Sequence, residues 1–470
     1  MTRSSDGPST ARKVANLLPK RVSAPWELFA QHLVHHEIHL AGTRVEMLRG
    51  PIELEGFALR IFRSRAGATS VGLSSSNDGT KKGVERAVEV AERSAPYSSF
   101  PAKELHLPTA DQPVGGLEVE DPRVRDDPVG GLRSLVQEIL QQFPAHSDVV
   151  PSFGSVRITH GESSVVNSAG LEQREVSTYV EFEWAVKASG GPEGRPAGEF
   201  WVNSSSRRLD PESLGVDVPR WSELARDVRR AKTPPNGELK VLFPARVLQD
   251  ILPEVLGFRL GGSARLRKMA PEVGSSVGSP AVNIWDDPHL PWGDGSGGID
   301  DEGTPTSRRL VVEGGTVRGH FYDALHASAL GGSPLGGGHR SGGLGKSWHR
   351  FTVGPTPGAS NLSIAPGSGG TDAELIEAAG EGIWLEQLGY AFPDPFSGAY
   401  GGEIRIGYRI RNGRLAEPVR GGTVGGLVLA PMGEPSLLRG VSSVGGKARF
   451  VGGFQSPTLL VEGIQVAGSS

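Results

Sequence analysis

The chain has 470 residues, a formal net charge of −4 and no cysteine. This length exceeds what one hydrophobic core usually organises, so two or three domains are expected. The charge is nearly balanced, and nothing in the sequence resembles the clustered basic face of a nucleic-acid-binding protein. The lack of cysteine excludes disulfides, thiolate zinc sites and cysteine nucleophiles.

The ends and overall composition indicate where such a chain works. No apolar run is long enough to span a membrane, and the N-terminus is polar and basic without the apolar stretch of a secretory signal. We therefore expect a cytoplasmic protein with no membrane partner and a disordered tail over residues 1–24. The 67 glycines and 35 prolines favour a loop-rich β protein.

Residues 25–100 are predicted to form an N-terminal α+β subdomain of mixed strands with a covering helix. A proline at the first turn predicts a short helix over Pro25–Val34. Alternating apolar residues predict strands, and the spacing of Val84, Ala87, Val88 and Ala91 predicts an amphipathic helix. The expected strands are Glu37–Met47, Gly56–Phe62 and Thr69–Leu73, and the amphipathic helix is Lys81–Arg93.

An acidic, proline-bearing linker is expected over residues 101–127, followed by a helix-plus-strand subdomain over 128–235. Apolar residues at helical spacing from Leu132 to Phe143 predict its first helix. A strand is expected over Ser155–His160, with a turn at Gly161-Glu162. The pattern further predicts a long strand over Val176–Val186, a basic helix over Trp221–Ala231 and a domain boundary at Thr233–Gly237.

The C-terminal region, residues 236–470, is predicted to be a β-rich domain that is barrel-like or sandwich-like. It begins with a strand over Leu239–Phe243 and a helix over Ala245–Leu260 that Pro253 interrupts. Glycine clusters then separate short strands, which favours an antiparallel β architecture over βαβ winding. The expected strands are Ala281–Trp285, Arg309–Glu313, Glu403–Arg411 and Thr458–Val461. The fold class is therefore α+β.

An acidic stretch, Asp300-Asp301-Glu302, precedes Gly303 and a hairpin. Gly314-Gly315 is predicted to turn this hairpin, with Thr316–Tyr322 as its returning strand. Together with Asp286 and Asp287, the acids could supply oxygen ligands for Mg²⁺ or Ca²⁺. Their spacing does not match an EF-hand, and aspartate before glycine or proline is common turn chemistry. We therefore expect them to cap turns.

Two further motifs suggest chemistry that their context does not support. The run Gly342–Ser347 is similar to a phosphate-binding loop, but Arg340 stands where that motif needs its first glycine, so we expect a flexible glycine loop. His32, His35, His36 and His39 would share one face of a helix. The surrounding residues favour a strand, where neighbouring side chains diverge, so we do not expect a metal site there.

Several long motifs in order resemble the TldD/PmbA family, the "modulator of DNA gyrase" proteins. They cover nearly the whole chain after about residue 25. The segments that carry the resemblance are Glu37–Gly50, Val166–Leu171, Asp286–Pro288, Asp300–Thr306, Val312–Asp323, Pro357–Gly367, Glu374–Ile376 with Gly382-Ile383, Ile410–Val419 and Ser456–Gly463.

The resemblance implies a two-part family. TldD-type members are zinc metallopeptidases with HExxxH on a helix and a distal cysteine ligand. PmbA/TldE-type members lack that site and pair with a TldD-type subunit, and the pair trims unfolded or leader-bearing peptides. Aligning the run after Leu256 puts HExxxH on Pro253–Phe258, so Pro253 and Phe258 replace both histidines and only Glu254 persists. The distal cysteine would fall near Ser443–Gly445.

Two functions follow. The first is a non-catalytic, metal-free subunit that forms a peptide chamber with a zinc-bearing TldD-type partner, with a homodimer left open. The second is a stand-alone peptide hydrolase that uses the acidic stretch or the remaining histidines: His289, His320, His326, His339 and His349. For either function, the candidates for lining a peptide groove are Asp300, Asp301, Glu302, Thr304 and Asn361. The chain itself is expected to hold no cofactor, and zinc is expected in the partner.

Overall fold

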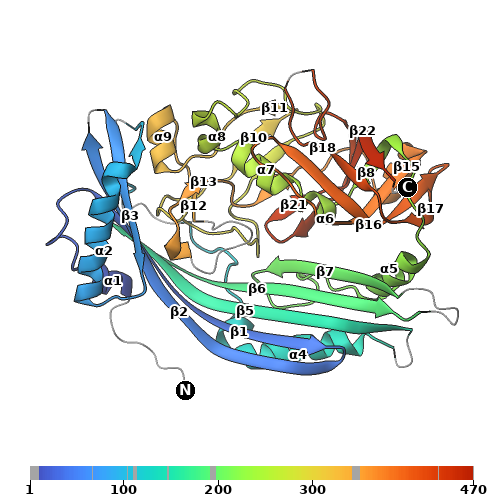
Figure 1. The fold of residues 1–470 in the computed structure, drawn as a ribbon, viewed down its shortest axis with the longest axis horizontal. Helices are drawn as coiled ribbons and strands as arrows, with labels where there is room; N and C mark the ends of the chain where they lie inside the picture. The colour runs from blue at the N-terminus through green and yellow to red at the C-terminus, as the bar shows by residue number, and fades with distance from the viewer. Residues whose placement is uncertain are drawn as a thin grey trace.

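A computed structural model describes residues 10–65, 67–102, 104–109, 114–144, 148–190, 197–340, 350–431 and 433–468. Over these ranges the chain is an α+β protein with a β-rich C-terminal half, so the predicted fold class is confirmed. The N-terminal half is a long curved sheet, and the C-terminal half lies on its concave side (Figure 1).

The N-terminal sheet has seven strands in the order β4-β3-β2-β1-β5-β6-β7, and every neighbouring pair is antiparallel. Its four central strands are long, which allows one sheet to extend beneath the whole C-terminal half (Figure 1). The strands are β1 (Trp26–Ala41), β2 (Arg44–Arg65), β3 (Ala68–Ser76), β4 (Ser99–Phe100), β5 (Val149–Asn167), β6 (Glu172–Ala188) and β7 (Gly198–Ser206).

The prediction of a helix over Pro25–Val34 is wrong, because these residues form the start of β1. Trp26, Leu28 and Ala30 pack with the N-terminal helices on one face, while Phe29 joins a cluster with Phe351 on the other. With both faces buried, apolar residues occur on both faces of the strand, which therefore lacks its usual alternation. The predicted turn at Gly161-Glu162 is also wrong, because β5 continues through it and Gly161 pairs with Leu33 of β1 and Ser177 of β6.

Helices cover the outer face of this sheet, and two of them fall where the sequence pattern predicted helices: α2 over Lys81–Ser94 and α4 over Pro128–Gln141. Residues 10–24 are not the expected disordered tail, because Ala11, Val14 and Leu18 pack into the cluster beneath α2. The remaining helices here are α1 (Thr10–Ala15), η1 (Ala95–Tyr97), α3 (Pro122–Asp126) and α5 (Val218–Arg230). The predicted domain limits stay predictions.

The C-terminal half contains a β barrel. Its strands follow the order β15-β8-β22-β18-β16-β17, and β15 also pairs with β16, which closes the ring. The sheet strands are β8 (Gly237–Phe243), β15 (Gly382–Gly389), β16 (Ala399–Arg411), β17 (Arg414–Val419), β18 (Thr423–Leu427), β19 (Val441–Val444) and β22 (Leu459–Ala467). Closure pairs the backbone of β15 with that of β16, so neither of these two strands leaves a long unpaired edge in the ring.

A second C-terminal sheet has the order β11-β10-β9-β14-β21-β20 and packs on the barrel through a shared apolar core. It consists of β9 (Ile284–Asp286), β10 (Arg309–Glu313), β11 (Thr316–Val317), β14 (Leu362–Ile364), β20 (Arg449–Val451) and β21 (Phe454–Ser456). A two-stranded ribbon, β12 (Gly338–His339) with β13 (Thr356–Pro357), lies beside it. The C-terminal helices are α6 (Ala245–Leu248), α7 (Leu252–Arg259), α8 (Gly262–Leu266), α9 (Ala324–Leu330), η2 (Arg350–Thr352) and α10 (Asp372–Ala379).

The hairpin after the acidic stretch is confirmed at its turn and shortened at its end. Gly314 and Gly315 have φ of +53° and +69°, which only glycine adopts without strain. The returning strand stops at Val317, whereas the prediction continued it to Tyr322. The predicted loop over Gly342–Ser347 lies outside the described residues. Among those that are described, no helix is both long and apolar enough to cross a membrane.

Candidate functional site

The acidic stretch folds into a tight turn that its own first carboxylate organises. Asp300 Oδ1 accepts hydrogen bonds from the backbone N–H of Glu302 (3.0 Å) and of Thr304 (2.8 Å). Asp300 Oδ2 accepts from the backbone N–H of Gly338 at 2.9 Å, which joins the turn to β12. Burial raises the pKa of Asp300, against the lowering effect of these three donors. The carboxylate therefore acts as a turn cap, as the sequence predicted.

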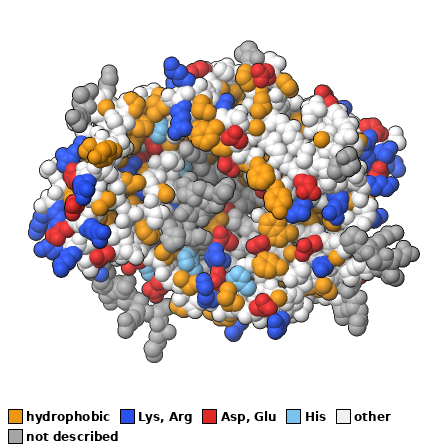
Figure 2. All heavy atoms as spheres, in the orientation of Figure 1, with side chains coloured by type: hydrophobic (Ala, Val, Ile, Leu, Met, Phe, Trp, Pro, Cys, Tyr) orange, Lys and Arg blue, Asp and Glu red, His pale blue; other side chains and the backbone are white. Residues whose placement is uncertain are grey.

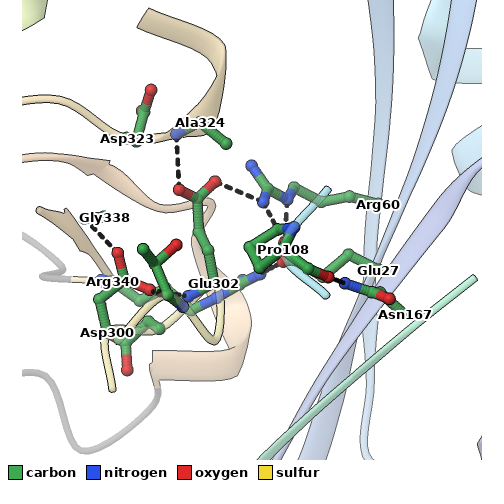
Figure 3. A network of polar contacts seen from close by, with 12 residues as sticks. Glu27, Arg60, Pro108, Asn167, Asp300, Glu302, Asp323, Ala324, Gly338 and Arg340 are labelled. Carbon is green, nitrogen blue, oxygen red and sulfur yellow. Dashed lines mark hydrogen bonds and ion pairs between the residues drawn. The ribbon is translucent and has the colours of Figure 1, made fainter. Parts of the chain in front are cut away.

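Glu302 belongs to a buried ion network that connects the two halves of the protein (Figure 3). Its Oε1 accepts from Arg60 Nη2 of β2 at 2.7 Å, and its Oε2 accepts from the backbone N–H of Ala324 at 2.7 Å. Arg60 also pairs with Glu27 of β1, and Glu27 accepts a second bond from Arg340 at 2.8 Å. All four side chains are buried, so each charge depends on its partners.

The other acids near this turn are equally engaged. Asp301 accepts from Arg350 Nη1 at 2.8 Å and from the backbone N–H of Arg340 at 2.7 Å. Asp286 accepts from Arg309 and from the backbone of Ser360 and Asn361. Across the described ranges, no group of three or more His, Asp or Glu side chains is arranged to hold a metal ion. The oxygens of these carboxylates accept from donors within the protein and are not arranged as ligands of a cation.

Helix α7 carries the position that the family resemblance assigns to zinc. Pro253 lies in its first turn and Phe258 near its end, with Val255 and Leu256 buried in the C-terminal core. The Phe258 ring packs on Phe396 with centroids 4.8 Å apart and the planes tilted by 52°. Zinc needs nitrogen, sulfur or oxygen donors, and neither proline nor phenylalanine has one in its side chain. These residues do not fit a zinc ion.

The loop after β15 covers this end of α7. Arg259 Nη1 donates to the Phe396 carbonyl oxygen at 2.9 Å, and the Arg267 guanidinium lies 5.7 Å from the centre of the Phe396 ring. Glu254 points to the surface, where partial burial and the nearby carboxylate of Asp394 raise the pKa of its carboxyl. Glu254 thus lies beside the Phe258–Phe396 contact and near Asp394. The motif contains no histidine that could bind a metal ion together with Glu254.

A cavity of about 260 Å³, whose wall consists mostly of polar residues, lies between the N-terminal sheet and the C-terminal loops. Figure 2 shows charged and apolar side chains together on the face of the molecule where the two halves meet. Strands β1, β5 and β6 form one wall, and the loops around residues 294–301, 339–340 and 358–360 form the other. The cavity exists only because the two halves face each other.

Charged groups in the cavity wall are paired within the protein. Glu175 Oε1 accepts from the backbone N–H of Gly298 at 2.8 Å, and burial raises the pKa of its carboxyl. Arg207 donates to the carbonyl oxygens of Gly293 and Asp294, both at 2.9 Å. Burial lowers the pKa of His339, so its imidazole is neutral at neutral pH. The wall is therefore polar with little free charge.

Two of the five candidate groove residues line the cavity, and the other three do not. Asp300 and Asp301 line the cavity. Glu302 lies in the ion network, and Thr304 and Asn361 are not part of the cavity wall. The Asn361 amide instead connects loops, donating to the Asp287 carbonyl oxygen at 2.8 Å and accepting from the Gly295 N–H at 2.9 Å.

Sequence reasoning missed several residues of the cavity wall and the ion network. Three of them are separated in sequence from the acidic stretch by more than a hundred residues, and only the sheet brings them near. A correct strand prediction over residues 26–41 would have placed Phe29, Gln31 and Leu33 on one face and drawn attention to the glutamine between two apolar residues. The missed residues include Gln31, Arg60, Glu175, Arg207 and Arg340.

The four spare histidines that lie in the described ranges do not gather into one site. His339 is in the cavity wall, where its Nε2 lies 3.4 Å from Ser360 Oγ. His289, His320 and His326 each contact a different group: Thr306 Oγ1, the Pro271 carbonyl oxygen and the Asp323 carboxylate. His349 lies outside the described residues. In the described cluster on β1, His35 contacts Thr159 and His39 lies near Glu37.

Comparison with known sequences supports the family resemblance. Residues 236–468 match the family model described as the PmbA/TldA metallopeptidase C-terminal domain. A metalloprotease TldD homolog of Haemophilus influenzae is 27% identical over 247 residues, which are 50% of this chain and 49% of that protein. A TldD homolog of Buchnera aphidicola is 22% identical over 354 residues, covering 72% and 70% of the two chains. The aligned region thus spans about half the length of the Haemophilus relative.

Solved structures share the whole fold. A protein from Thermotoga maritima described as a modulator of DNA gyrase superposes with a TM-score of 0.79 at 21% identity, covering 97% of this chain and 99% of that one. TldE from Thermococcus kodakarensis superposes with a TM-score of 0.73 at 18% identity, with 97% and 99% coverage. The ordered motifs, the C-terminal domain match and the shared two-part fold lead to one conclusion: this chain belongs to the TldD/PmbA family.

Proposed function

We propose that this chain is the metal-free, non-catalytic subunit of a TldD/TldE-type peptidase, working in the cytoplasm with a zinc-bearing partner of the same family. One observation carries the proposal: at the two positions that the family resemblance assigns to the histidines of HExxxH, this chain has Pro253 and Phe258, and Phe258 is packed against Phe396. The chain also has no cysteine to serve as a distal ligand. Three missing donors cannot be replaced by Glu254 alone.

Peptide hydrolysis by such an enzyme needs a Lewis acid and an activated water, which the zinc-bearing partner would supply. This chain would contribute surface: the paired polar wall between its halves, and the exposed Glu254 end of α7. Its substrate class is an unfolded or leader-bearing peptide, held in an extended conformation by backbone hydrogen bonds. The fold shared with TldE supports this role.

The alternative is a stand-alone hydrolase that uses the acids or histidines. A general base must be free to take a proton from a water or a substrate. Asp300, Asp301 and Glu302 are each occupied by backbone or arginine donors. The histidines are dispersed among separate contacts. No arrangement among these described residues favours this alternative.

The test is a reconstitution. The purified chain, a family member with intact HExxxH, and a mixture of the two are assayed on an unfolded peptide, with and without a chelator. We expect no turnover by this chain alone, and chelator-sensitive turnover that rises when both chains are mixed. Chelator-sensitive turnover by the isolated chain would overturn the proposal, and so would a mixture in which the chains neither associate nor change activity.

A further inference from the structure

A pocket of about 500 Å³ lies where α5 and β7 face the C-terminal half, and it shares no wall residue with the cavity described above. Its other wall residues come from α6, α10, β15, β17 and β20 and from the loop before α5. The volume is in the usual range for sites that bind small molecules. Apolar side chains that are at least partly exposed line it: Ile376, Leu415 and Phe450. Three arginines line it as well: Arg220, Arg246 and Arg449.

Two of these arginines have carboxylate partners and the third does not. Arg220 pairs with Glu386, and Arg449 pairs with Asp372 at 2.9 Å. Arg246 forms no hydrogen bond or ion pair with another group in the part of the chain that the structure describes. Its guanidinium instead lies 5.5 Å from the centre of the Phe200 ring. A cation that is taken partly out of water without a counter-ion is costly, so this arginine needs an explanation.

The guanidinium of Arg246 is both partly buried and accessible. Burial lowers the pKa of its guanidinium, while Glu386 and Asp250 raise it from beyond ion-pair distance. The side chain stays charged at neutral pH because an arginine begins from a very high pKa. Its nitrogens are not closed off from solvent, so a group in the pocket can reach them. The pocket wall therefore presents one set of unpaired, charged N–H donors.

The carboxylates of the wall limit the charge of a ligand. Two of the four neutralise Arg220 and Arg449, as described above. Asp217 caps α5 by accepting from the backbone N–H of Arg220 at 3.0 Å, and Glu212 is exposed. The wall thus has no surplus of positive charge, which disfavours a dianion such as phosphate. A single carboxylate matches one guanidinium, because the two groups form two parallel N–H···O bonds.

We propose that this pocket binds the carboxylate of a monoanionic ligand that also carries an apolar side chain. The Arg246 guanidinium donates two hydrogen bonds to the carboxylate, and the apolar residues of the wall contact the side chain. The free C-terminus of a short peptide has this chemistry. That the natural ligand is a peptide rests on the proposed function. The binding itself needs neither zinc nor a partner subunit, so a failed reconstitution with intact binding would overturn only the proposed function.

The experiment titrates the isolated full chain with N-acetyl-leucine, a monoanion with an apolar side chain, and follows binding by calorimetry. The comparison probes are N-acetyl-leucinamide, which is neutral and nearly the same shape, and inorganic phosphate. Arg246→Met removes the guanidinium and keeps an apolar stem, whereas Arg246→Lys keeps the charge without the two parallel donors. Arg133→Met is the matched control, because Arg133 is exposed on α4 and outside the pocket wall.

We expect N-acetyl-leucine to bind more tightly than either comparison probe and to raise the melting temperature of the wild type. Arg246→Met should weaken its binding by about tenfold or more, because a charge-assisted pair is lost. Arg246→Lys should have an intermediate affinity, and the control should equal the wild type.

Four results would overturn the proposal: no binding to the wild type, equal or tighter binding of the neutral amide, equal or tighter binding of phosphate, and unchanged affinity in Arg246→Met. If Arg246→Met does not fold, Arg246→Lys decides the question. Wild-type affinity in Arg246→Lys would then contradict recognition by the guanidinium.

Discussion

Two regions of this protein have opposite characters. The end of α7, where the family resemblance places zinc, is apolar: Phe258 packs on Phe396, and Val255 and Leu256 enter the core. The interface between the N-terminal sheet and the C-terminal loops is polar, with a buried network of Glu27, Arg60, Glu302 and Arg340 beside a cavity whose wall consists mostly of polar residues.

The difference indicates how far each region can change without loss of the fold. A zinc ligand can be replaced by an apolar residue without leaving a buried charge behind, so the metal position can be lost while the fold persists. A buried ion network cannot lose one member so easily, because the remaining charges would stay unpaired in a low-dielectric interior. The network joins β1 and β2 to loops more than two hundred residues away, so it fixes how the two halves face each other.

The largest effect is expected in the network. Arg60→Met leaves Glu27 and Glu302 without their common cation, so we expect a loss of about 3–5 kcal/mol in the free energy of unfolding. Urea denaturation measures it. Arg63→Met on the same strand is the control: Arg63 pairs with Glu92 at the surface, and its loss should cost about 0–1 kcal/mol. Equal effects of the two variants would contradict the assigned importance of the network.

A smaller effect is expected at the metal position. Phe258→Ala removes the aromatic contact with Phe396, which should lower the free energy of unfolding by about 1–2 kcal/mol. Phe392→Ala on the covering loop is the control, because that ring is 71% exposed and should contribute within about 0.5 kcal/mol. If Phe258→Ala were as mild as the control, the aromatic packing would not explain why this site is closed.

Titration of His339 gives a modest effect that depends on pH. Burial lowers the pKa of His339, so below the ordinary histidine pKa the unfolded chain binds more protons than the folded one. The stability that the neutral, buried His339 side chain contributes is therefore fully present above about pH 6.5 and is lost as the pH falls. The free energy of unfolding then changes with a limiting slope of about 1.4 kcal/mol per pH unit. His339→Gln should lose less stability than the wild type between pH 7 and pH 5 in urea titrations. A parallel loss in both proteins would contradict this account.

No effect is expected from Glu254→Ala on turnover by the reconstituted pair, since Glu254 is exposed and has no metal-binding neighbours in its motif. The comparison with the wild type uses the same peptide and requires that the two chains still associate. A loss of turnover with intact association would show that Glu254 contributes to a shared site.

Local chemistry made part of this structure predictable. The hairpin over residues 309–317 follows from β-branched residues on either side of Gly314-Gly315, whose positive φ values only glycine tolerates cheaply. The capping role of Asp300 follows from aspartate before a turn. Helices α2 and α4 have one apolar face, so their periodicity is visible in the sequence.

The rest depends on partners distant in sequence. β1 is buried on both faces, so the spacing of its apolar residues also fits a helix. The helix prediction therefore gave no reason to single out Gln31. Arg60 and Glu302 come into contact only because the two halves pack together, and no local sequence pattern near either residue predicts this contact. Only the family resemblance indicates the metal position, since the side chains of Pro253 and Phe258 have no atom that could bind zinc.

The central claim is that this chain is the metal-free partner of a zinc peptidase. Its most direct test is the zinc content of the purified chain, and of its complex with an HExxxH-bearing family member, after equilibration with excess zinc and gel filtration. The account predicts no stoichiometric zinc in the isolated chain, and one zinc per pair in the complex, accompanied by peptide turnover. One zinc bound to the isolated chain, with turnover that a chelator abolishes, would contradict it.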